Sequence, residues 1–368
     1  MRSLASAACA SLALAAPALV SGSSALGESA GPATLESTAG SWTATASMAT
    51  PRAHLTATRL GNGRVLVVGG VDEPTAELYD SSTSTWIPGG TLNEPHWGHV
   101  AVRLANGRVL VAGGGRYSAG AELYDPATNS WTRTGSMNVG RISLTGTLLR
   151  DGRVLVVGGL SADGTGVQTS AELYDPANGR WTLTGSLRTP RRNHTATLLA
   201  DGTVLVAGGF NSSGWLRSAE LYDPARGRWT RTAPMTTARE GATATVLGNG
   251  RVLVAGGGNP SALSSAELYD PASGKWNRTG SMTGYGGTAA RLQDGRVLVA
   301  GGGNNGEIYS PATGTWTSTD PVVDPGLSGR AAAVLPNGQV LYTGGERFYC
   351  GVKQCFYDPS AKAELFTP

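Results

Sequence analysis

Residues 194–232 read HTATLLADGTVLVAGGFNSSGWLRSAELYDPARGRWTRT, and this stretch decides the fold because close copies of it recur along the chain. HTATLL alternates small polar and apolar residues, and Asp201-Gly202 then marks a tight hairpin turn. VLVAGG is an apolar run that suits burial on both faces. AELYDP forms a third segment, and the fourth begins at Trp229. One copy therefore predicts one four-stranded antiparallel sheet.

The same signals return seven times between residues 40 and 368. A Trp marks the fourth segment, a glycine pair ends the second, and Asn-Gly or Asp-Gly joins the first two. The tryptophans are Trp42, Trp86, Trp131, Trp181, Trp229, Trp276 and Trp316. A lone sheet of this kind cannot cover both apolar faces. We therefore expect the copies to pack around an axis as an all-β, seven-bladed propeller.

The order of glycine pair, Tyr and Trp at this period resembles the kelch repeat over about residues 40 to 368. It also resembles the propeller domain of galactose oxidase-like proteins, because the final AELFTP is similar to the end of that domain. The resemblance implies the fold and leaves the function open, since function lies in sites carried on a shared scaffold.

The first and last segments predict how the ring closes. Trp42 to Met48 is typical of a fourth strand without preceding partners, and Ala363 to Pro368 matches a third strand. We therefore expect the N-terminal strand to complete blade seven. A second alignment, with the third strand of this blade at Phe356–Pro359, stays open at this point.

The N-terminal segment predicts export from the cytosol. Residues 1–27 combine Arg2, an apolar run and small residues, which is typical of a secretory signal peptide. Residues 28–39 are then a linker and residues 40–368 the propeller. The alternative is a transmembrane anchor, but Ser and Pro interrupt the run, so we expect no stable span after cleavage and a secreted or periplasmic protein. A net charge of +3 without a Lys/Arg-rich run argues against nucleic-acid binding.

The positions of the cysteines and histidines indicate which disulfide and metal sites the chain can form. Cys350 and Cys355 form a close pair in an exported chain, which predicts a local disulfide. The histidines His54, His99 and His194 do not share one repeat position, whereas a zinc site needs three or four ligands on one centre. We therefore expect no metal site at these histidines and no cofactor.

The two faces of the predicted ring differ in their connections. Turns between strands one and two, and between strands three and four, are nearly constant in length and lie on one face. Connections between strands two and three, and between blades, vary and lie on the other, which we call the loop face. Variation on a repeated framework favours binding loops. Two successive rim positions at the start of strand one carry, first, Arg52, His96, Arg141, Arg191, Arg239, Gly284 and Leu327, and second, Ala53, Trp97, Ile142, Arg192, Glu240, Tyr285 and Ser328.

The rim supplies the candidate binding residues. Its first position predicts an electropositive mouth that binds a carboxylate or sulfate, since Arg forks suit such groups. The alternative is structural pairing with the repeated glutamates Glu77, Glu122, Glu172, Glu220, Glu267 and Glu307. Trp97, Trp215 and Tyr285 break the repeat with aromatic rings that either stack on sugars or pack loops. Glu240, with Arg239 and Arg192, is a candidate acid/base group, although no catalytic residue is assigned.

Two classes of function follow. The first is a non-catalytic extracellular binding protein for a glycan or a protein. The second is a sugar-modifying enzyme similar to the periplasmic sialic-acid mutarotases, which are kelch propellers that use Arg and Glu around an acidic sugar. A copper-radical oxidase is disfavoured, because those enzymes need a Cys–Tyr crosslink, a second Tyr and two His ligands, and the chain has no Tyr-His dipeptide. Whether the protein is an enzyme stays open, with binding favoured.

Overall fold

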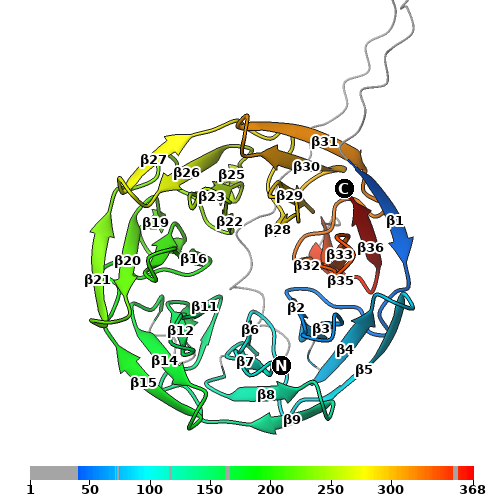
Figure 1. Ribbon diagram of the computed structural model, residues 1–368, viewed down its shortest axis with the longest axis horizontal. Coiled ribbons are helices and arrows are strands. Elements are labelled where there is room, and N and C mark those ends of the chain that lie inside the picture. The colour runs from blue at the N-terminus through cyan, green and yellow to red at the C-terminus, as the bar shows by residue number, and fades with distance from the viewer. Residues whose placement is uncertain (1–39, 71, 73, 116–117, 162–165, 351–354) are drawn as a thin grey trace, which may run out of the picture.

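The computed structural model describes residues 40–70, 72, 74–115, 118–161, 166–350 and 355–368. Within these ranges all regular structure is β, arranged as seven four-stranded antiparallel sheets around a central axis (Figure 1). The first strand of each sheet lies nearest the axis and the fourth lies at the periphery. The predicted seven-bladed propeller is confirmed. The signal peptide and linker predicted at residues 1–39 lie outside the described residues.

The strands of each blade are given from the axis outward. Blade one contains β2 (Thr56–Arg59), β3 (Val65–Val68), β4 (Thr75–Asp80) and β5 (Thr85–Thr91). Blade two contains β6 (Val100–Arg103), β7 (Val109–Ala112), β8 (Ala121–Asp125) and β9 (Ser130–Arg133). Blade three contains β11 (Thr145–Leu148), β12 (Val154–Val157), β14 (Ala171–Asp175) and β15 (Arg180–Thr184). Blade four contains β16 (Thr195–Leu198), β17 (Val204–Ala207), β20 (Ala219–Asp223) and β21 (Arg228–Thr232).

The remaining blades follow the same order. Blade five contains β22 (Thr243–Val246), β23 (Val252–Ala255), β26 (Ala266–Asp270) and β27 (Lys275–Arg278). Blade six contains β28 (Thr288–Arg291), β29 (Val297–Ala300), β30 (Asn305–Ser310) and β31 (Thr315–Pro321). Blade seven contains β32 (Ala331–Val334), β33 (Val340–Thr343), β36 (Ala363–Thr367) and β1 (Ser41–Thr45). Short strand pairs on the loop face are β10 (Arg141–Ile142) with β13 (Leu160–Ser161), β18 (Phe210–Asn211) with β19 (Gly214–Trp215), β24 (Gly258–Asn259) with β25 (Ser261–Ala262), and β34 (Glu346–Cys350) with β35 (Cys355–Pro359).

Blade seven closes the ring with both ends of the propeller. Strand β1 pairs with β36, with Trp42 opposite Phe366, and Figure 1 shows the blue β1 beside β36 and β31. The Trp42 indole packs on Tyr342 and Phe366 at centroid distances of 5.2 and 5.0 Å, and its Nε1 donates to Thr319 Oγ1 of blade six at 2.9 Å. Closure by the N-terminal strand is confirmed. The second alignment is wrong, because Phe356–Pro359 lies in β35, which pairs with β34.

The second strand of each blade forms the core, which explains why its sequence is apolar without alternation. In β17, Val204 and Val206 pack in a cluster with blade three, whereas Leu205 and Ala207 pack in a cluster with blade five. Both faces of the strand are therefore buried, and polar residues at either set of positions would lose this burial.

Each Trp of a fourth strand also links its blade to the preceding one. The Trp229 ring packs on Tyr222 of its own blade at 4.9 Å, and its Nε1 donates to the Gly185 carbonyl of blade three at 2.6 Å. Thr184 of blade three bonds the Tyr222 hydroxyl at 2.7 Å. Inter-blade indole bonds of this kind are donated by Trp42, Trp86, Trp131, Trp181, Trp229, Trp276 and Trp316. The repeated Trp is thus a packing anchor and a hydrogen-bond donor.

No helix among the described residues is long and apolar enough to span a membrane.

Candidate functional site

The four rim arginines lie inside the blades. Exposed fractions of at most 1% are found for Arg52, Arg141, Arg191 and Arg239. Nη1 of Arg141 donates to the carbonyl oxygens of Gly158 and Ser170 at 3.0 and 2.9 Å. Its Nη2 donates to Glu172 at 2.8 Å, and the same carboxylate accepts the backbone N–H of Asn138 at 2.7 Å. This ion pair therefore fixes the segment that enters blade three to the third strand of that blade.

The burial of this ring corrects one prediction and confirms its alternative. Guanidinium groups inside the blades cannot bind a carboxylate or sulfate at the surface, so the binding residues predicted at this position are scaffold. The pairs that confirm the structural alternative are Arg52–Glu77, His96–Glu122, Arg141–Glu172, Arg191–Glu220 and Arg239–Glu267. In blade six the Gly284 N–H donates to Glu307 at 2.7 Å, and in blade seven Arg330 pairs with Glu364.

Side chains of blades four and five assemble on the loop face, where β16 and β22 begin. We call this the mouth cluster: Arg192, Asn193, Phe210, Trp215 and Glu240. Trp215 Nε1 and Asn193 Nδ2 each donate to the Glu240 carboxylate at 3.2 Å. The Arg192 guanidinium lies 5.3 Å from the Phe210 ring centroid, and Phe210 packs edge-on against Trp215 at 5.5 Å. Arg192, Trp215 and Glu240, all singled out from the sequence, are thus brought together.

The mouth cluster is built as a link between two blades. Glu240 exposes only 1% of its surface, and both of its oxygens accept hydrogen bonds from blade four. Arg239, which we expected beside it, turns into blade five and pairs with Glu267 at 3.1 Å. The predicted trio of Arg192, Arg239 and Glu240 is therefore not assembled, and the mutarotase alternative loses the arginine pair on which it depended.

A collar of backbone hydrogen bonds runs around the axis two positions after the buried ring. Its residues have φ between 50° and 67°, and they are His54, Gly98, Ser143, Asn193, Gly241 and Gly329. Five of these six amides donate to the carbonyl of the preceding blade: His54 to Gly329, Gly98 to His54, Ser143 to Gly98, Asn193 to Ser143 and Gly241 to Asn193. The Gly at several of these repeat positions was a signal for positive φ that the sequence analysis did not use.

The collar is interrupted at blade six. The amide of Gly286, at the corresponding position, donates to Leu263 at 3.3 Å, and among the described residues no collar bond joins blade six to blades five or seven. The adjacent Tyr285 is 52% exposed, whereas Trp97 and Trp215 are half-buried. Of the three aromatic residues that break the repeat at the rim, Tyr285 therefore presents its ring most fully to solvent.

Among the described residues of the loop face, the longest strand pair is β34–β35 of blade seven, which we call the aromatic hairpin. Phe348 and Tyr357 pack at 4.9 Å, and Tyr349 stacks on Phe356 at 5.5 Å. Successive cross-strand pairs lie on opposite sides of a two-stranded ribbon, so both sides carry aromatic rings. Exposed fractions of 53%, 40% and 46% are found for Tyr349, Phe356 and Tyr357.

Contacts at the base of the aromatic hairpin hold it against the propeller. Glu346 bonds His54 Nε2 at 3.0 Å, and Arg347 pairs with Asp324. The strand register places Cys350 opposite Cys355 at the far end. The side chains of these cysteines lie outside the described residues, so the disulfide stays a prediction.

Two of the histidines, His99 and His194, contact hydroxyl groups of the preceding blades. Nε2 of His99 and of His194 lie 2.9 Å from the hydroxyls of Thr56 and Thr145 in the preceding blades. Burial, together with the neighbouring His96, lowers the pKa of His99 to about 3. Burial, together with the charge of Arg191, lowers the pKa of His194 to about 3 as well. Both imidazoles are therefore neutral at physiological pH.

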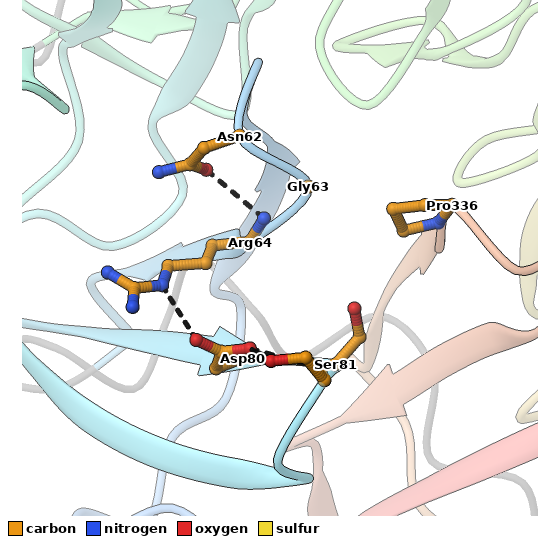
Figure 2. Close-up of a pocket in the computed structure, with 7 residues that line it drawn as sticks. Asn62, Gly63, Arg64, Asp80, Ser81 and Pro336 are labelled. Carbon is orange, nitrogen blue, oxygen red and sulfur yellow. Dashed lines mark hydrogen bonds and ion pairs between the residues drawn. The ribbon is translucent and has the colours of Figure 1, made fainter.

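The opposite face carries a groove of about 540 Å³ between the turns of blades one and seven. Figure 2 shows Arg64 and Asp80 joined on one wall of this groove, with Pro336 on the other wall. Arg64 Nε donates to Asp80 at 2.9 Å, and blade two repeats the contact between Arg108 and Asp125 at 3.0 Å. A contact that recurs in the turns is scaffold, so the loop face remains the candidate site.

Comparison with known proteins places this architecture in a family. The KLHDC2/KLHL20/DRC7 Kelch-repeats domain matches residues 98–302, which is more than half of the chain. The chain belongs to this kelch-repeat family. None of the curated proteins matches it. The kelch fold supports an interaction or binding role.

Among solved structures, the kelch chain is similar to one described as a novel fungal alcohol oxidase with catalytic diversity among the AA5 family, in complex with copper. The TM-score is 0.75 at 20% identity, covering 89% of this chain and 76% of that one. At this identity the likeness shows the galactose oxidase-like fold. The four histidines contact separate partners: His54 contacts Glu346, His96 contacts Glu122, His99 contacts Thr56 and His194 contacts Thr145.

Proposed function

We propose that this kelch protein is a secreted, non-catalytic binding protein that recognises a glycan or protein ligand on the loop face. The observation that supports it most is the aromatic hairpin, in which Tyr349, Phe356 and Tyr357 are each at least 40% exposed. Exposed aromatic groups that cluster in this way mark interaction sites on otherwise polar surfaces.

Tyr285 of the neighbouring blade six supports the same face. It is 52% exposed beside the interruption of the collar. Tyrosine rings combine a flat apolar surface with a hydroxyl that stays solvated, which suits both sugar stacking and protein contacts. Beneath them, the Glu307 carboxylate accepts from the Gly284 amide and Glu364 pairs with Arg330, so the bases of both segments are held to their blades.

Secretion is proposed from residues 1–27 alone, and its test is separate from that of binding. The full chain expressed in a secreting host should appear outside the cytosol with an N-terminus near residue 28. Retention of the full-length chain in the membrane fraction would favour the anchor alternative instead.

The binding test is a glycan array that includes acidic sugars, run with the intact protein and three variants. Tyr285→Ser and the double variant Tyr349→Ser/Phe356→Ser should each reduce binding at least tenfold. Leu183→Ser is the matched control, because Leu183 is 62% exposed on the peripheral strand β15. Equal binding by all variants would contradict the loop-face site.

Protein ligands and catalysis need their own measurements. If no glycan binds, crosslinking of the secreted protein to its extracellular neighbours should recover a partner with the intact protein and Leu183→Ser but not with the double variant. The rate of anomer exchange on N-acetylneuraminate should equal that in buffer. Acceleration would replace the binding proposal with the mutarotase alternative.

A further inference from the structure

Blade two departs from the repeat at three positions that meet in space. His96 stands where blades one, three, four and five have the buried Arg. Gly120 stands where those blades have Thr75, Ser170, Ser218 and Ser265. Glu94 stands where they have Thr50, Val139, Thr189 and Thr237. Because blades one, three, four and five repeat one set of residues here, three changes in the same blade indicate that blade two holds its entering segment in a different way.

The three changes fit together sterically. In blade three the Arg141 guanidinium bonds the Ser170 hydroxyl at 3.0 Å. A Cβ at Gly120, the equivalent of Ser170, would lie 1.6 Å from Oε1 of Glu94. The Glu94 carboxylate therefore fills space that a side chain occupies in the other blades, and only glycine at position 120 admits it.

The same changes alter the charge of the site. An Arg–Glu pair is neutral, whereas Glu94 and Glu122 place two carboxylates beside the single imidazole of His96. Glu122 is 1% exposed and accepts hydrogen bonds from the amides of Asn93 and Glu94, while Glu94 accepts from the Ser118 hydroxyl at 3.0 Å. Two carboxylates beside one imidazole leave at least one negative charge without a cationic partner, which favours a bound cation.

The His96 ring is oriented as a metal ligand would be. Nδ1 lies 2.6 Å from the Gly113 carbonyl oxygen, which only accepts, so Nδ1 carries the proton. Nε2 faces Glu122 Oε1 at 3.4 Å. An Nδ1–H bonded to a backbone carbonyl is the arrangement that fixes the tautomer and direction of metal-binding imidazoles.

We propose that Glu94, His96 and Glu122 bind one divalent transition-metal ion of the Zn²⁺ class. Their ligand atoms lie within 4.8 Å of one another. Tetrahedral coordination with bonds of about 2.0–2.2 Å puts ligand atoms about 3.3–3.6 Å apart, which matches the Nε2–Oε1 distance. Glu94 is half-buried, so rotation of its side chain can bring its carboxylate to the same distance from Nε2 of His96. Water then completes the coordination. One imidazole with two carboxylates suits Zn²⁺ better than Ca²⁺, which prefers six or more oxygens.

The ion would do in blade two what Arg does elsewhere. It joins Glu94 and His96, in the segment that enters the blade, to Glu122 on the third strand, and so replaces the cation of the repeat. The site is independent of the proposed glycan or protein binding. The rival is a metal-free site in which the contact between His96 and Glu122 alone holds the entering segment.

The test uses the intact chain after chelator treatment and dialysis, titrated with ZnCl₂ by calorimetry and by thermal melting. We expect one Zn²⁺ per chain and a melting temperature that rises with Zn²⁺ concentration. Glu94→Gln should weaken Zn²⁺ binding at least tenfold. The triple variant Glu94→Thr/His96→Arg/Gly120→Ser restores the repeat, so it should fold, bind no Zn²⁺ and melt independently of it.

His54→Gln is the control for exposed histidines, because it removes the His54–Glu346 pair without touching blade two. It should bind Zn²⁺ like the wild type. Absence of Zn²⁺ binding by the wild type, or equal binding by the triple variant, would overturn the proposal. Binding of Ca²⁺ without Zn²⁺ would overturn the assignment to a transition metal.

Discussion

The Arg141 guanidinium donates to the Glu172 carboxylate at 2.8 Å, and neither side chain is exposed to solvent. The same pair recurs around the ring with the same backbone acceptors, so the rim arginines join blades to their connections. Arg191 and Arg239 each leave Nε without a hydrogen-bond partner among the described residues. Because these guanidinium groups are buried, the loss of one should destabilise the protein more than the loss of an exposed ion pair.

Arg141→Met should destabilise the protein by about 3–5 kcal/mol, because it leaves the Glu172 carboxylate buried without its partner. Urea denaturation followed by tryptophan fluorescence measures this. Arg153→Met is the matched control, since the Arg153–Asp151 pair is 36% and 43% exposed and its loss should cost at most about 1 kcal/mol. Adding Glu172→Gln to Arg141→Met should recover part of the loss. Similar costs for the two single variants would contradict a scaffold role.

Removal of residues 40–48 should lower the melting temperature sharply, because it opens the ring at blade seven. Trp42→Ala tests the same closure with one residue, and it should cost about 3–5 kcal/mol, since the indole packs on Tyr342 and Phe366 and bonds Thr319. Differential scanning calorimetry measures both. A melt unchanged by the deletion would show that the N-terminal strand is dispensable.

The pH dependence of stability should carry the signature of the buried histidines. The pKa of His194 falls from 6.5 in the unfolded chain to about 3 in the fold, so the unfolded state binds more protons between these values. The stabilisation is complete above pH 6.5 and declines by about 1.4 kcal/mol per pH unit as pH falls towards 3.

Urea denaturation between pH 7 and pH 4 measures this loss. Carboxylates contribute to the same slope, so the comparison is with His194→Gln, which keeps a polar group near Thr145 and does not titrate. The wild-type curve should fall more steeply than that of the variant. Parallel curves would mean that His194 is protonated in the folded protein.

Trp215 and Glu240 should be energetically coupled across blades four and five. Trp215→Phe removes a donor to a carboxylate that is 1% exposed, so we expect a loss of about 1–3 kcal/mol. A double-mutant cycle with Glu240→Gln should give a coupling energy of about 0.5–3 kcal/mol from thermal or chemical denaturation. Additive effects would indicate that Trp215 is free to serve as a binding surface.

Sequence periodicity by itself determined the number of blades, the four strands of each repeat and the blade that the N-terminal strand completes. These follow from local turns and alternating burial, which are properties of short segments repeated along one chain. The pairing of the rim Arg residues with Glu172 and its equivalents was among the interpretations that the sequence allowed. The three-dimensional structure decided between a binding ring and a scaffold, because it shows that the rim Arg side chains point into the blades.

Tertiary structure alone decided which deviations from the repeat meet. Glu94, His96 and Glu122 lie in two segments, and Trp215 and Glu240 in two blades, so no spacing along the chain brings them together. The first three residues meet because the segment that enters blade two packs against the third strand of that blade. Trp215 and Glu240 meet because blade four packs against blade five. Sequence thus determined the scaffold through local interactions, whereas contacts between distant segments decided where its chemistry lies.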